Sequence, residues 1–269
     1  MIRVGVVGAC GRMGQIVCRT VVEDPDLALV AAIDRSRVGE RIGPLVGHPE
    51  INGVNVSDEL DSLTDAECEV AVDFTHPDVV RENVRWCVAH AVNLVVGTTG
   101  LTEPDLNGFR ELLEHEGGES NVIVAPNFAL GAVLMQHFSA IAARFLPAAE
   151  VIELHHEGKA DAPSGTALAT VRRILGERQA EYRGPDAESL EGARGGELQG
   201  VRVHSVRLPG LVAHQEVIFG GQGQTLTIRH DSMDRSSFMP GVVMAVKAIA
   251  SRRGLTVGLE QLLDLPPTR

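Results

Sequence analysis

The first half of the chain alternates short apolar runs with stretches of helical periodicity. Five apolar runs predict buried strands at 2–7, 27–33, 69–73, 92–96 and 121–125. Amphipathic patterns between the later runs predict a helix at 77–90, with Pro77 at its start, and another at 102–116, with Thr102 as its N-cap. Strands that alternate with helices are typical of a doubly wound parallel sheet.

The pattern changes after Asn127. It predicts a helix at 129–145, a strand at 149–155 and a further helix at about 165–175. The polar, glycine-rich stretch 177–200 is interpreted as a loop.

Three alternating runs follow, at 201–208, 212–219 and 224–230, and the short turns between them predict an antiparallel meander. The last pattern, 236–251, is helical again. The sequence therefore predicts an α/β protein with two domains. A Rossmann-like doubly wound parallel sheet for dinucleotide binding is expected from 1–126 plus 236–269. A C-terminal α+β domain for substrate binding and oligomerisation, with an open mixed four-stranded sheet, is expected from 127–235.

Composition narrows the class of protein. The 269 residues are 44% hydrophobic, enough for a large core or two modest ones. A net charge of −12 and 3% aromatic residues argue against a nucleic-acid partner. Four cysteines without a CxxC pair argue against a disulfide framework. Since the start of the chain lacks a signal-peptide pattern and no apolar run approaches the ~18 residues of a membrane span, we expect a cytoplasmic protein without a membrane partner.

A glycine-rich turn follows the first predicted strand. Gly8, Gly11 and Gly14 have the spacing GxxGxxG, which would let backbone N–H groups approach a pyrophosphate at the start of a helix. Asp34 closes the second strand 20 residues after Gly14, where an acid can bind ribose hydroxyls, and Arg35 could instead meet a 2′-phosphate. We therefore expect both NADH and NADPH to be accepted. The alternative is an ordinary tight turn with a surface aspartate.

Later strand ends add small and hydroxyl residues at what should be the same edge of the sheet. These are DFT at 73–75, GTTG at 97–100 and APNF at 125–128. Each could be an ordinary loop, but together they predict a groove for the nicotinamide half of a dinucleotide.

The stretch ELHHEGKADAPSGTA, residues 153–167, is the candidate chemical site. Strand alternation places His155 and His156 on opposite faces, yet both can border one cavity where the strand ends. Histidine exchanges protons near neutral pH, and Lys159 adds a fixed cation or a second proton donor. The alternatives are a metal site, for which no third ligand stands at zinc-like spacing, and structural histidines beside a surface lysine. We interpret His204, His214, His230 and Trp86 as structural residues.

A helix start follows the histidine pair. Pro163 and Ser164 have the character of a first turn, with Ser164 as N-cap. The N–H groups of Gly165 and Thr166 would then face an anion, most simply a carboxylate. A small dicarboxylate substrate fits this arrangement.

The string from Glu153 to Ala167 closely resembles the signature of the 4-hydroxy-tetrahydrodipicolinate (dihydrodipicolinate) reductase family. The turns VGACGRMG, GTTG and APNF and the stretch HSVRLPGLVAHQEVIFG are also similar to that family. The resemblance covers residues 1 to about 250. It implies NAD(P)H-dependent reduction of 4-hydroxy-tetrahydrodipicolinate to tetrahydrodipicolinate on the route to diaminopimelate and lysine, by a homotetramer.

The resemblance also implies site residues. His155 would be the proton donor and Lys159 the second catalytic group, while the substrate would contact His156, Gly165 and Thr166. The cofactor, NADH or NADPH, would contact Gly8, Ala9, Cys10, Gly11, Arg12, Met13, Asp34, Arg35, Gly97, Thr98, Thr99, Ala125, Pro126, Asn127 and Phe128. Cys10 departs from the small residue common at its position and makes the loop oxidisable. Two rival interpretations stay open: another NAD(P)-dependent amino-acid dehydrogenase, and a catalytically silent dinucleotide-sensing regulator.

Overall fold

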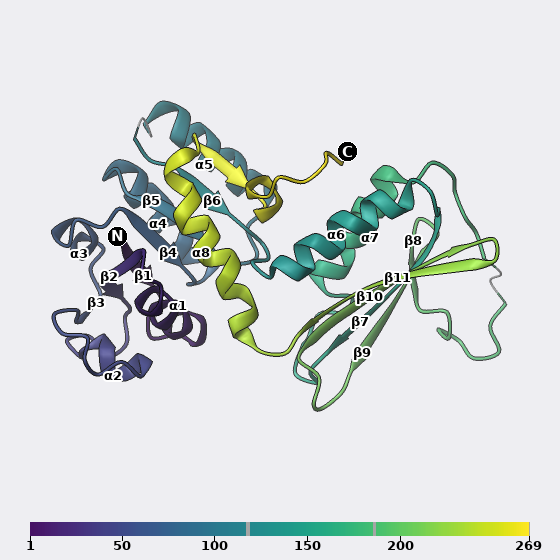
Figure 1. Ribbon diagram of the computed structural model, residues 1–269, viewed down its shortest axis with the longest axis horizontal. Coiled ribbons are helices and arrows are strands. Elements are labelled where there is room, and N and C mark those ends of the chain that lie inside the picture. The colour runs from purple at the N-terminus through teal and green to yellow at the C-terminus, as the bar shows by residue number, and fades with distance from the viewer. Residues whose placement is uncertain (117–118, 185–186, 269) are drawn as a thin grey trace. The chain divides into compact units, whose positions relative to one another are not determined.

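The structure is a computed structural model that describes residues 1–116, 119–184 and 187–268. The chain divides into two compact units (Figure 1). The first unit comprises Met1–Phe128 and Phe238–Asp264, and the second comprises Ala129–Ser237 and the segment that begins at Leu265. Residues 117–118 and 269 of the predicted first domain and residues 185–186 of the predicted loop lie outside the described residues.

The first unit contains a seven-stranded parallel sheet. Its strand order is β12-β6-β5-β4-β1-β2-β3. Five strands match the predicted runs, and β3 and β12 are additions of two and three residues, too short to show a period. The bounds are β1 Ile2–Val7, β2 Leu27–Ile33, β3 Val56–Ser57, β4 Val70–Asp73, β5 Asn93–Val96, β6 Val122–Val124 and β12 Leu255–Val257.

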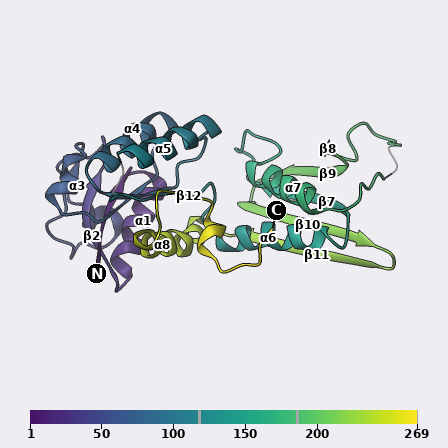
Figure 2. The same ribbon diagram turned by 90° about the horizontal axis from the view of Figure 1, so that it is seen from above.

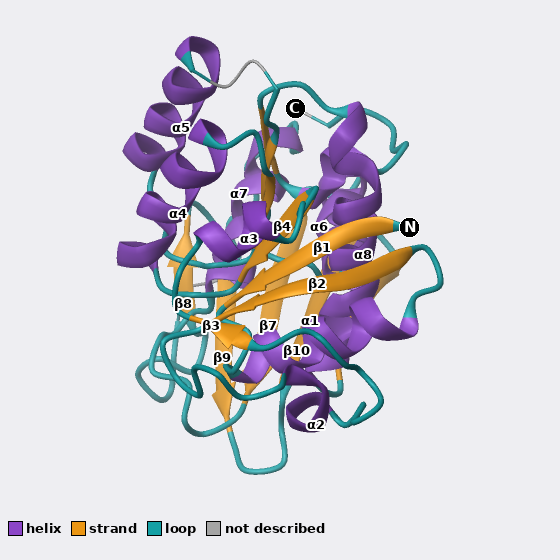
Figure 3. Ribbon diagram, turned by 90° about the vertical axis from the view of Figure 1, so that its left-hand side faces the viewer, coloured by secondary structure: helices purple, strands orange, loops and turns teal. Residues whose placement is uncertain are grey.

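Helices cover both faces of this sheet, as Figure 3 shows. One face carries α1 (Arg12–Glu23) and α8 (Met239–Ala248), and the other carries α3 (Asp61–Asp65), α4 (Pro77–Ala89) and α5 (Glu103–His115). The short elements are α2 Ile42–Val46, η2 Ile249–Ser251 and η3 Leu259–Leu262. Buried side chains of the strands and of α3 to α5, among them Leu63, Val84, Leu94 and Phe109, form one core. The doubly wound sheet expected from the sequence is confirmed.

Local sequence explains where two of these helices begin. Pro77 occupies the first turn of α4, where its missing N–H costs no hydrogen bond. At the start of α5, Thr102 and Asp105 form a capping box in which each side chain meets the other residue's backbone. Both starts agree with the sequence prediction.

The second unit contains a five-stranded mixed sheet with the order β11-β10-β7-β9-β8. The central strand, β7, runs antiparallel to β10 and parallel to β9. The bounds are β7 Ala148–His155, β8 Gly196–Leu198, β9 Val201–Arg207, β10 Ala213–Gly221 and β11 Gln224–Ser232, with η1 at Arg235–Phe238.

Two details of the predicted sheet were wrong. The sheet has five strands rather than four, because β8 lies within the stretch 177–200 that we interpreted as a loop. Gln199 and Gly200 both have positive φ, which folds this three-residue strand back onto β9. The three later runs also do not form one meander, since β7 lies between β9 and β10 and only β10 and β11 pair as a hairpin.

One face of this sheet is covered by α6 (Leu130–Ala143) and α7 (Gly165–Glu177), whose arrangement can be followed in Figure 2. Alternate residues of β7 and β10, including Val151 and Val217, are buried beneath them. The side chains between them, Ile152, Leu154 and Ile218, point to the opposite face and are half-exposed. Within the described residues, no helix has the length and apolar character needed to span a bilayer.

Candidate functional site

The glycine turn of the first unit is shaped by close backbone contacts. Gly8 has φ of +82°, a conformation that favours glycine. A Cβ on Gly14 would lie 1.9 Å from the Gly8 carbonyl oxygen, so only glycine lets the start of α1 approach β1 this closely. The sequence spacing therefore reflects packing of the helix against the turn.

Three N–H groups of this turn form hydrogen bonds within the first unit. Those of Gly8 and Ala9 donate to the Ile33 carbonyl at 2.8 and 3.0 Å, and that of Gly11 donates to the Gly8 carbonyl at 3.1 Å. These bonds hold the turn in shape. At the first turn of α1, by contrast, Gly11 is an N-cap without a side chain, and no acidic residue follows it. The positive end of α1 can therefore receive a phosphate.

Asp34 fastens the glycine turn to the end of β2. Its Oδ2 accepts the N–H of Cys10 at 2.9 Å, and its Oδ1 accepts both the N–H and the hydroxyl of Ser36 at 2.9 and 2.7 Å. The neighbouring Arg35 is exposed. The carboxylate is thus oriented beside the turn, where ribose hydroxyls can reach it.

A buried carboxylate that our predicted site lacked joins two neighbouring strand ends. Asp73, the last residue of β4, is fully buried and accepts hydrogen bonds from Thr75, Asn83 and Thr98. Burial raises the pKa of Asp73, and these hydrogen bonds act in the opposite direction. Since Thr98 follows β5, Asp73 fixes the loop after that strand. The sequence signal was the acid of DFT at a strand end.

Phe74 brings three loops of the same sheet edge together. Its ring lies so close to Gly97 that a Cβ there would approach it to 2.2 Å. The ring also packs against Phe128, with 5.9 Å between the centroids. The loops after β4, β5 and β6 therefore meet, as the sequence predicted from the parallel order of their strands.

A cavity of about 630 Å³ opens at this edge. Four predicted cofactor residues line it, namely Gly8, Gly11, Asp34 and Arg35. Its wall also contains Phe74 and Thr75, from the DFT strand end that predicted a groove here, together with Asn83 and Trp86, which our predicted site did not include. Trp86, interpreted as structural from the sequence, stacks on His90 at 4.1 Å and faces the cavity as well.

The remaining predicted cofactor residues do not line this cavity. Ala9, Thr98, Ala125 and Phe128 are buried, so these side chains support the edge from within. The others follow the same strand ends or open α1: Cys10, Arg12, Met13, Gly97, Thr99, Pro126 and Asn127.

In the second unit, the predicted chemical residues gather where β7 ends. Glu153 and His155 lie on the sheet face that α7 covers; the Glu153 side chain is 0% exposed and that of His155 14%. Nδ1 of His155 contacts Oε2 of Glu153, which holds the imidazole against the carboxylate. His156 lies beyond the strand and is exposed.

Arg207, on β9, is a site residue that the sequence did not reveal. It pairs with His155 in the sheet register and binds both oxygens of Glu153 at 2.8 Å. Such two-point pairing of guanidinium and carboxylate is strong and directional. The only sequence signal is a charge in the alternating run 201–208.

The start of α7 has the predicted geometry. The hydroxyl of Ser164 accepts the N–H of Ala167 at 3.1 Å and caps the helix. The N–H of Ser164 itself donates to Oε1 of Glu153 at 3.2 Å, which ties the helix start to the histidine strand. Gly165 is exposed and a Cβ there would meet nothing within 4 Å, so the space around it is open. Thr166, the second predicted binding residue, follows on the same turn.

Lys159 lies on the loop that joins β7 to α7. Its Nζ is 2.7 Å from Oδ1 of Asp161, and 24% of the side chain is exposed. The structure thus brings Lys159, His155 and the start of α7 together through one network. The backbone carbonyl of His156 accepts the N–H of Lys159 at 3.1 Å.

The local electrostatics affects the pKa values of Glu153 and His155. Burial alone would raise the pKa of Glu153, but hydrogen bonds from Arg207, Ser205 and His155 outweigh it and hold that pKa below its usual value. Burial lowers the pKa of His155, while Glu153 acts against that shift. Glu153 is therefore ionised, and the imidazole readily releases its proton.

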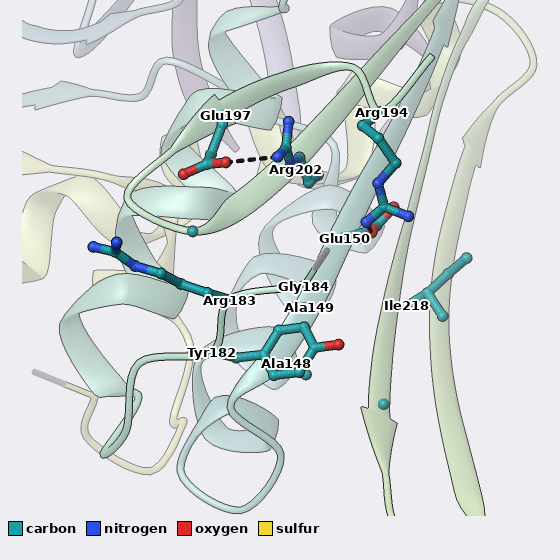
Figure 4. A pocket seen from close by; sticks show the side chains of 12 residues that line it. Ala148, Ala149, Glu150, Tyr182, Arg183, Gly184, Arg194, Glu197, Arg202 and Ile218 are labelled. Carbon is teal, nitrogen blue, oxygen red and sulfur yellow. Dashed lines mark hydrogen bonds and ion pairs between the residues drawn. The ribbon is translucent and has the colours of Figure 1, made fainter. Parts of the chain in front are cut away.

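A second cavity, in the second unit, contains several ion pairs. This cavity of about 390 Å³, shown in Figure 4, is lined by arginines and glutamates. There Arg202 binds Glu197 at 3.0 Å and Arg194 binds Glu150 at 2.6 Å. Because no predicted site residue lines it, this cavity is not part of the candidate site.

The histidines that we interpreted as structural have structural contacts. His204 binds Glu150 at 2.9 Å and His214 binds Asp231 at 2.7 Å, while His230 packs beside Gly131 of α6. Across the described parts of the chain, no cluster of three or more potential metal ligands is found.

The parallel sheet with its glycine turn, together with a separate unit that carries an acid–base cluster, defines a dinucleotide-dependent oxidoreductase. Solved structures support this fold class. An amine dehydrogenase from Mycobacterium smegmatis aligns with a TM-score of 0.70 over 100% of this chain and 97% of its own; at 17% identity it shows the fold alone.

The chain belongs to the dihydrodipicolinate reductase family. Residues 2–128 match the family model "Dihydrodipicolinate reductase, N-terminus", and residues 131–263 match "Dihydrodipicolinate reductase, C-terminus". The 4-hydroxy-tetrahydrodipicolinate reductase of Nocardia farcinica is 51% identical over 268 residues, 98% of this chain and 99% of the relative. The structure of a dipicolinate-bound dihydrodipicolinate reductase from Paenisporosarcina sp. TG-14 aligns with a TM-score of 0.86 and 42% identity, over 98% of this chain and 100% of that one. The family resemblance and the enzyme class expected from the sequence are confirmed.

Proposed function

We propose that the chain reduces 4-hydroxy-tetrahydrodipicolinate to tetrahydrodipicolinate with NADH or NADPH, a step towards diaminopimelate and lysine. The observation that carries this proposal is the single network joining a proton donor, His155, to an open helix start at Gly165 through Glu153. The relative from Nocardia farcinica is a 4-hydroxy-tetrahydrodipicolinate reductase, and the similar dihydrodipicolinate reductase from Paenisporosarcina was solved with dipicolinate bound.

The substrate is a flat ring with two carboxylates, and the second unit offers matching groups. We assign one carboxylate to the N–H groups of Gly165 and Thr166 at the positive end of α7, which has 13 residues and a capped start. We assign His156, exposed beyond β7, to binding of the same substrate. Holding the ring in a fixed place accounts for much of the rate enhancement through orientation.

The first unit fits the dinucleotide. The uncapped start of α1 suits a pyrophosphate, and Asp34 suits ribose hydroxyls. Arg35 lines the same cavity and supplies a cation for a 2′-phosphate, which supports use of both cofactors. We assign the predicted residues around Gly8–Met13, Gly97–Thr99 and Ala125–Phe128 to the same ligand. When bound, the reduced nicotinamide supplies a hydride.

Residues of the second unit then neutralise and stabilise the negative charge that develops on the substrate. The 4-hydroxyl of the substrate leaves as water, which gives an unsaturated ring; hydride addition to that ring builds negative charge along an enamine, which an acid must neutralise. His155 donates the proton from Nε2, because its Nδ1 is held by Glu153. We assign Lys159, beside Asp161 in this structure, to stabilise the developing charge.

A spectrophotometric assay tests this function. The upstream aldol-type synthase generates the substrate in place, and oxidation of NADH or NADPH is followed at 340 nm, the absorbance maximum of reduced nicotinamides. We expect turnover with both cofactors and competitive inhibition by pyridine-2,6-dicarboxylate. Turnover of aspartate or diaminopimelate instead would favour an amino-acid dehydrogenase, and binding of cofactor without turnover of any of these would favour a silent regulator.

We further propose that the chain forms a homotetramer through the open face of the second sheet. Ile152, Leu154, Val206 and Ile218 are half-exposed on that face, and a second copy would cover them. Analytical ultracentrifugation should give four times the mass of one chain. We assign dinucleotide binding to the first unit, and substrate binding and assembly to the second. The four unpaired thiols fit a reducing compartment such as the cytoplasm.

A further inference from the structure

Glu153 has more partners than a simple neighbour of His155 needs. Its Oε2 contacts His155 Nδ1 and accepts from Arg207 Nη1, and its Oε1 accepts from Arg207 Nη2 and from the N–H of Ser164. A buried carboxylate is unfavourable unless it is paired and hydrogen-bonded, and both oxygens of Glu153 meet this condition. The carboxylate therefore connects the proton donor, a fixed cation and the start of α7.

Arg207 is fully occupied in holding this carboxylate and the adjoining loop. Guanidinium has five N–H donors. Two of them bind Glu153, and the others reach the carbonyls of Lys159 at 3.3 Å, Asp161 at 2.6 Å and Val206 at 2.8 Å. No donor is left over for a substrate, so the position of Arg207 supports Glu153 and the loop that carries Lys159.

We propose that Glu153, braced by Arg207, is a positioning residue that fixes the tautomer of His155 and the spacing between this proton donor and the anion site at the start of α7. The inference rests on the proposed role of His155. An ionised carboxylate can only accept, so Nδ1 of His155 must carry a hydrogen. The transferable proton is then always on Nε2, the nitrogen that remains for the substrate.

The charges around His155 make Glu153 decisive for its titration. Lys159 on the adjoining loop and Arg207 on β9 are cationic, and both oppose protonation of the ring, as burial does. The cross-strand neighbour on β10 is Ala213, and Ser164 at the start of α7 is also uncharged. Asp161 is paired with Lys159. Glu153 is thus the group that keeps the imidazole able to hold its proton.

Two substitutions should shift the pH profile in opposite directions. In Glu153→Gln, the loss of the negative charge should move the loss of kcat at high pH downward by about one unit and lower kcat about tenfold or more. In Arg207→Gln, a cation that faces the ring is removed, so the same limb should move upward. A merely structural role predicts falling stability in both variants without opposite shifts.

A matched control is available in the same unit. Glu177, at the end of α7, has a 3% exposed side chain and is bound by Arg144 at 2.8 Å, but the pair is remote in sequence from the site strand. Glu177→Gln should lower the melting temperature as Glu153→Gln does, because each removes a buried carboxylate that pairs with an arginine. It should leave the pH limb where it is.

The tautomer can be read directly, even if a variant does not fold. In wild-type protein with ¹⁵N-labelled histidine, NMR above the pKa should show His155 protonated at Nδ1 and bare at Nε2, with the signals assigned by their loss in His155→Gln. An Nε2–H tautomer would overturn the inference. Full activity of His155→Ala would instead defeat the proposed function. An inactive His155→Ala together with an unshifted Glu153→Gln would reject the role of Glu153 alone.

Discussion

At the scale of single residues, the proposed chemistry depends on which groups stay charged near neutral pH. Burial lowers the pKa of His155, so its imidazolium gives up its proton readily, while Arg207 keeps Glu153 ionised beside it. The sequence located His155 and Lys159 because they stand in one short segment. It could not locate Arg207, because that residue reaches Glu153 from a strand 54 positions away.

Removing either proposed catalytic group should slow the reaction. We expect His155→Ala and Lys159→Ala each to lower kcat about 100-fold or more, the usual scale for loss of a general acid. Steady-state kinetics with NADH checks this. His115→Ala, an exposed histidine in the last turn of α5, should retain wild-type turnover. Near-normal kcat in both site variants would contradict the assignment.

Cys10 should be a poor nucleophile despite its place in the cofactor turn. Burial and the neighbouring Asp34 raise the pKa of its thiol, so little thiolate exists at neutral pH. Alkylation by iodoacetamide, followed by mass spectrometry, should be slow at pH 7 and accelerate above pH 9. Cys10 should still react before Cys18, Cys68 and Cys87, which are buried. Rapid labelling of Cys10 at pH 7 would show that the turn lowers its pKa instead.

At the scale of secondary structure, the sequence predicted elements with a strong period and missed those without one. The helix starting at Pro77 and the capped helix at Thr102 were predictable because local chemistry sets them. β3, β8 and β12 have two or three residues, too few for a period. The predicted neighbour of β9 was wrong, because alternation reveals which residues of a strand are buried but not which strand lies beside it.

Two glycine substitutions should have opposite effects on stability. Gly14→Ala places a Cβ against the Gly8 carbonyl, so it should lower the melting temperature and weaken NADH binding. Gly108 lies inside α5, where a Cβ would meet nothing within 4 Å, and Gly108→Ala should stabilise the protein by about 0.5–1 kcal/mol through helix propensity. Calorimetry and NADH titration measure both. A stabilised Gly14→Ala with normal NADH affinity would contradict the close approach of α1 to the turn.

At the scale of the whole molecule, the two units contain residues for different parts of the proposed function. The residues proposed to bind the dinucleotide lie in the first unit, and the proposed proton donor lies in the second. The sequence predicts two domains because the hydrophobic pattern changes after Asn127. The surface proposed for assembly could not be predicted from the pattern, since the open sheet face of the second unit mixes apolar and charged residues.

Cofactor binding should therefore survive changes in the second unit. Trp86 is the only tryptophan, and it lines the cavity beside the glycine turn. Bound NADH should quench the fluorescence of Trp86 and emit light by energy transfer from it. The affinity for NADH measured in this way should be the same in wild type and in His155→Ala. Trp86→Phe, which keeps an aromatic ring but has no tryptophan emission, is the control for the fluorescence signal. A large loss of NADH affinity in His155→Ala would contradict the separation of the two functions.

The most direct test of the account is a crystal structure with NADH and pyridine-2,6-dicarboxylate bound. We predict one carboxylate of the ligand at the N–H groups of Gly165 and Thr166, with Nε2 of His155 facing the ring and Nδ1 still on Glu153. A ligand bound elsewhere, with His155 turned away from it, would contradict the account.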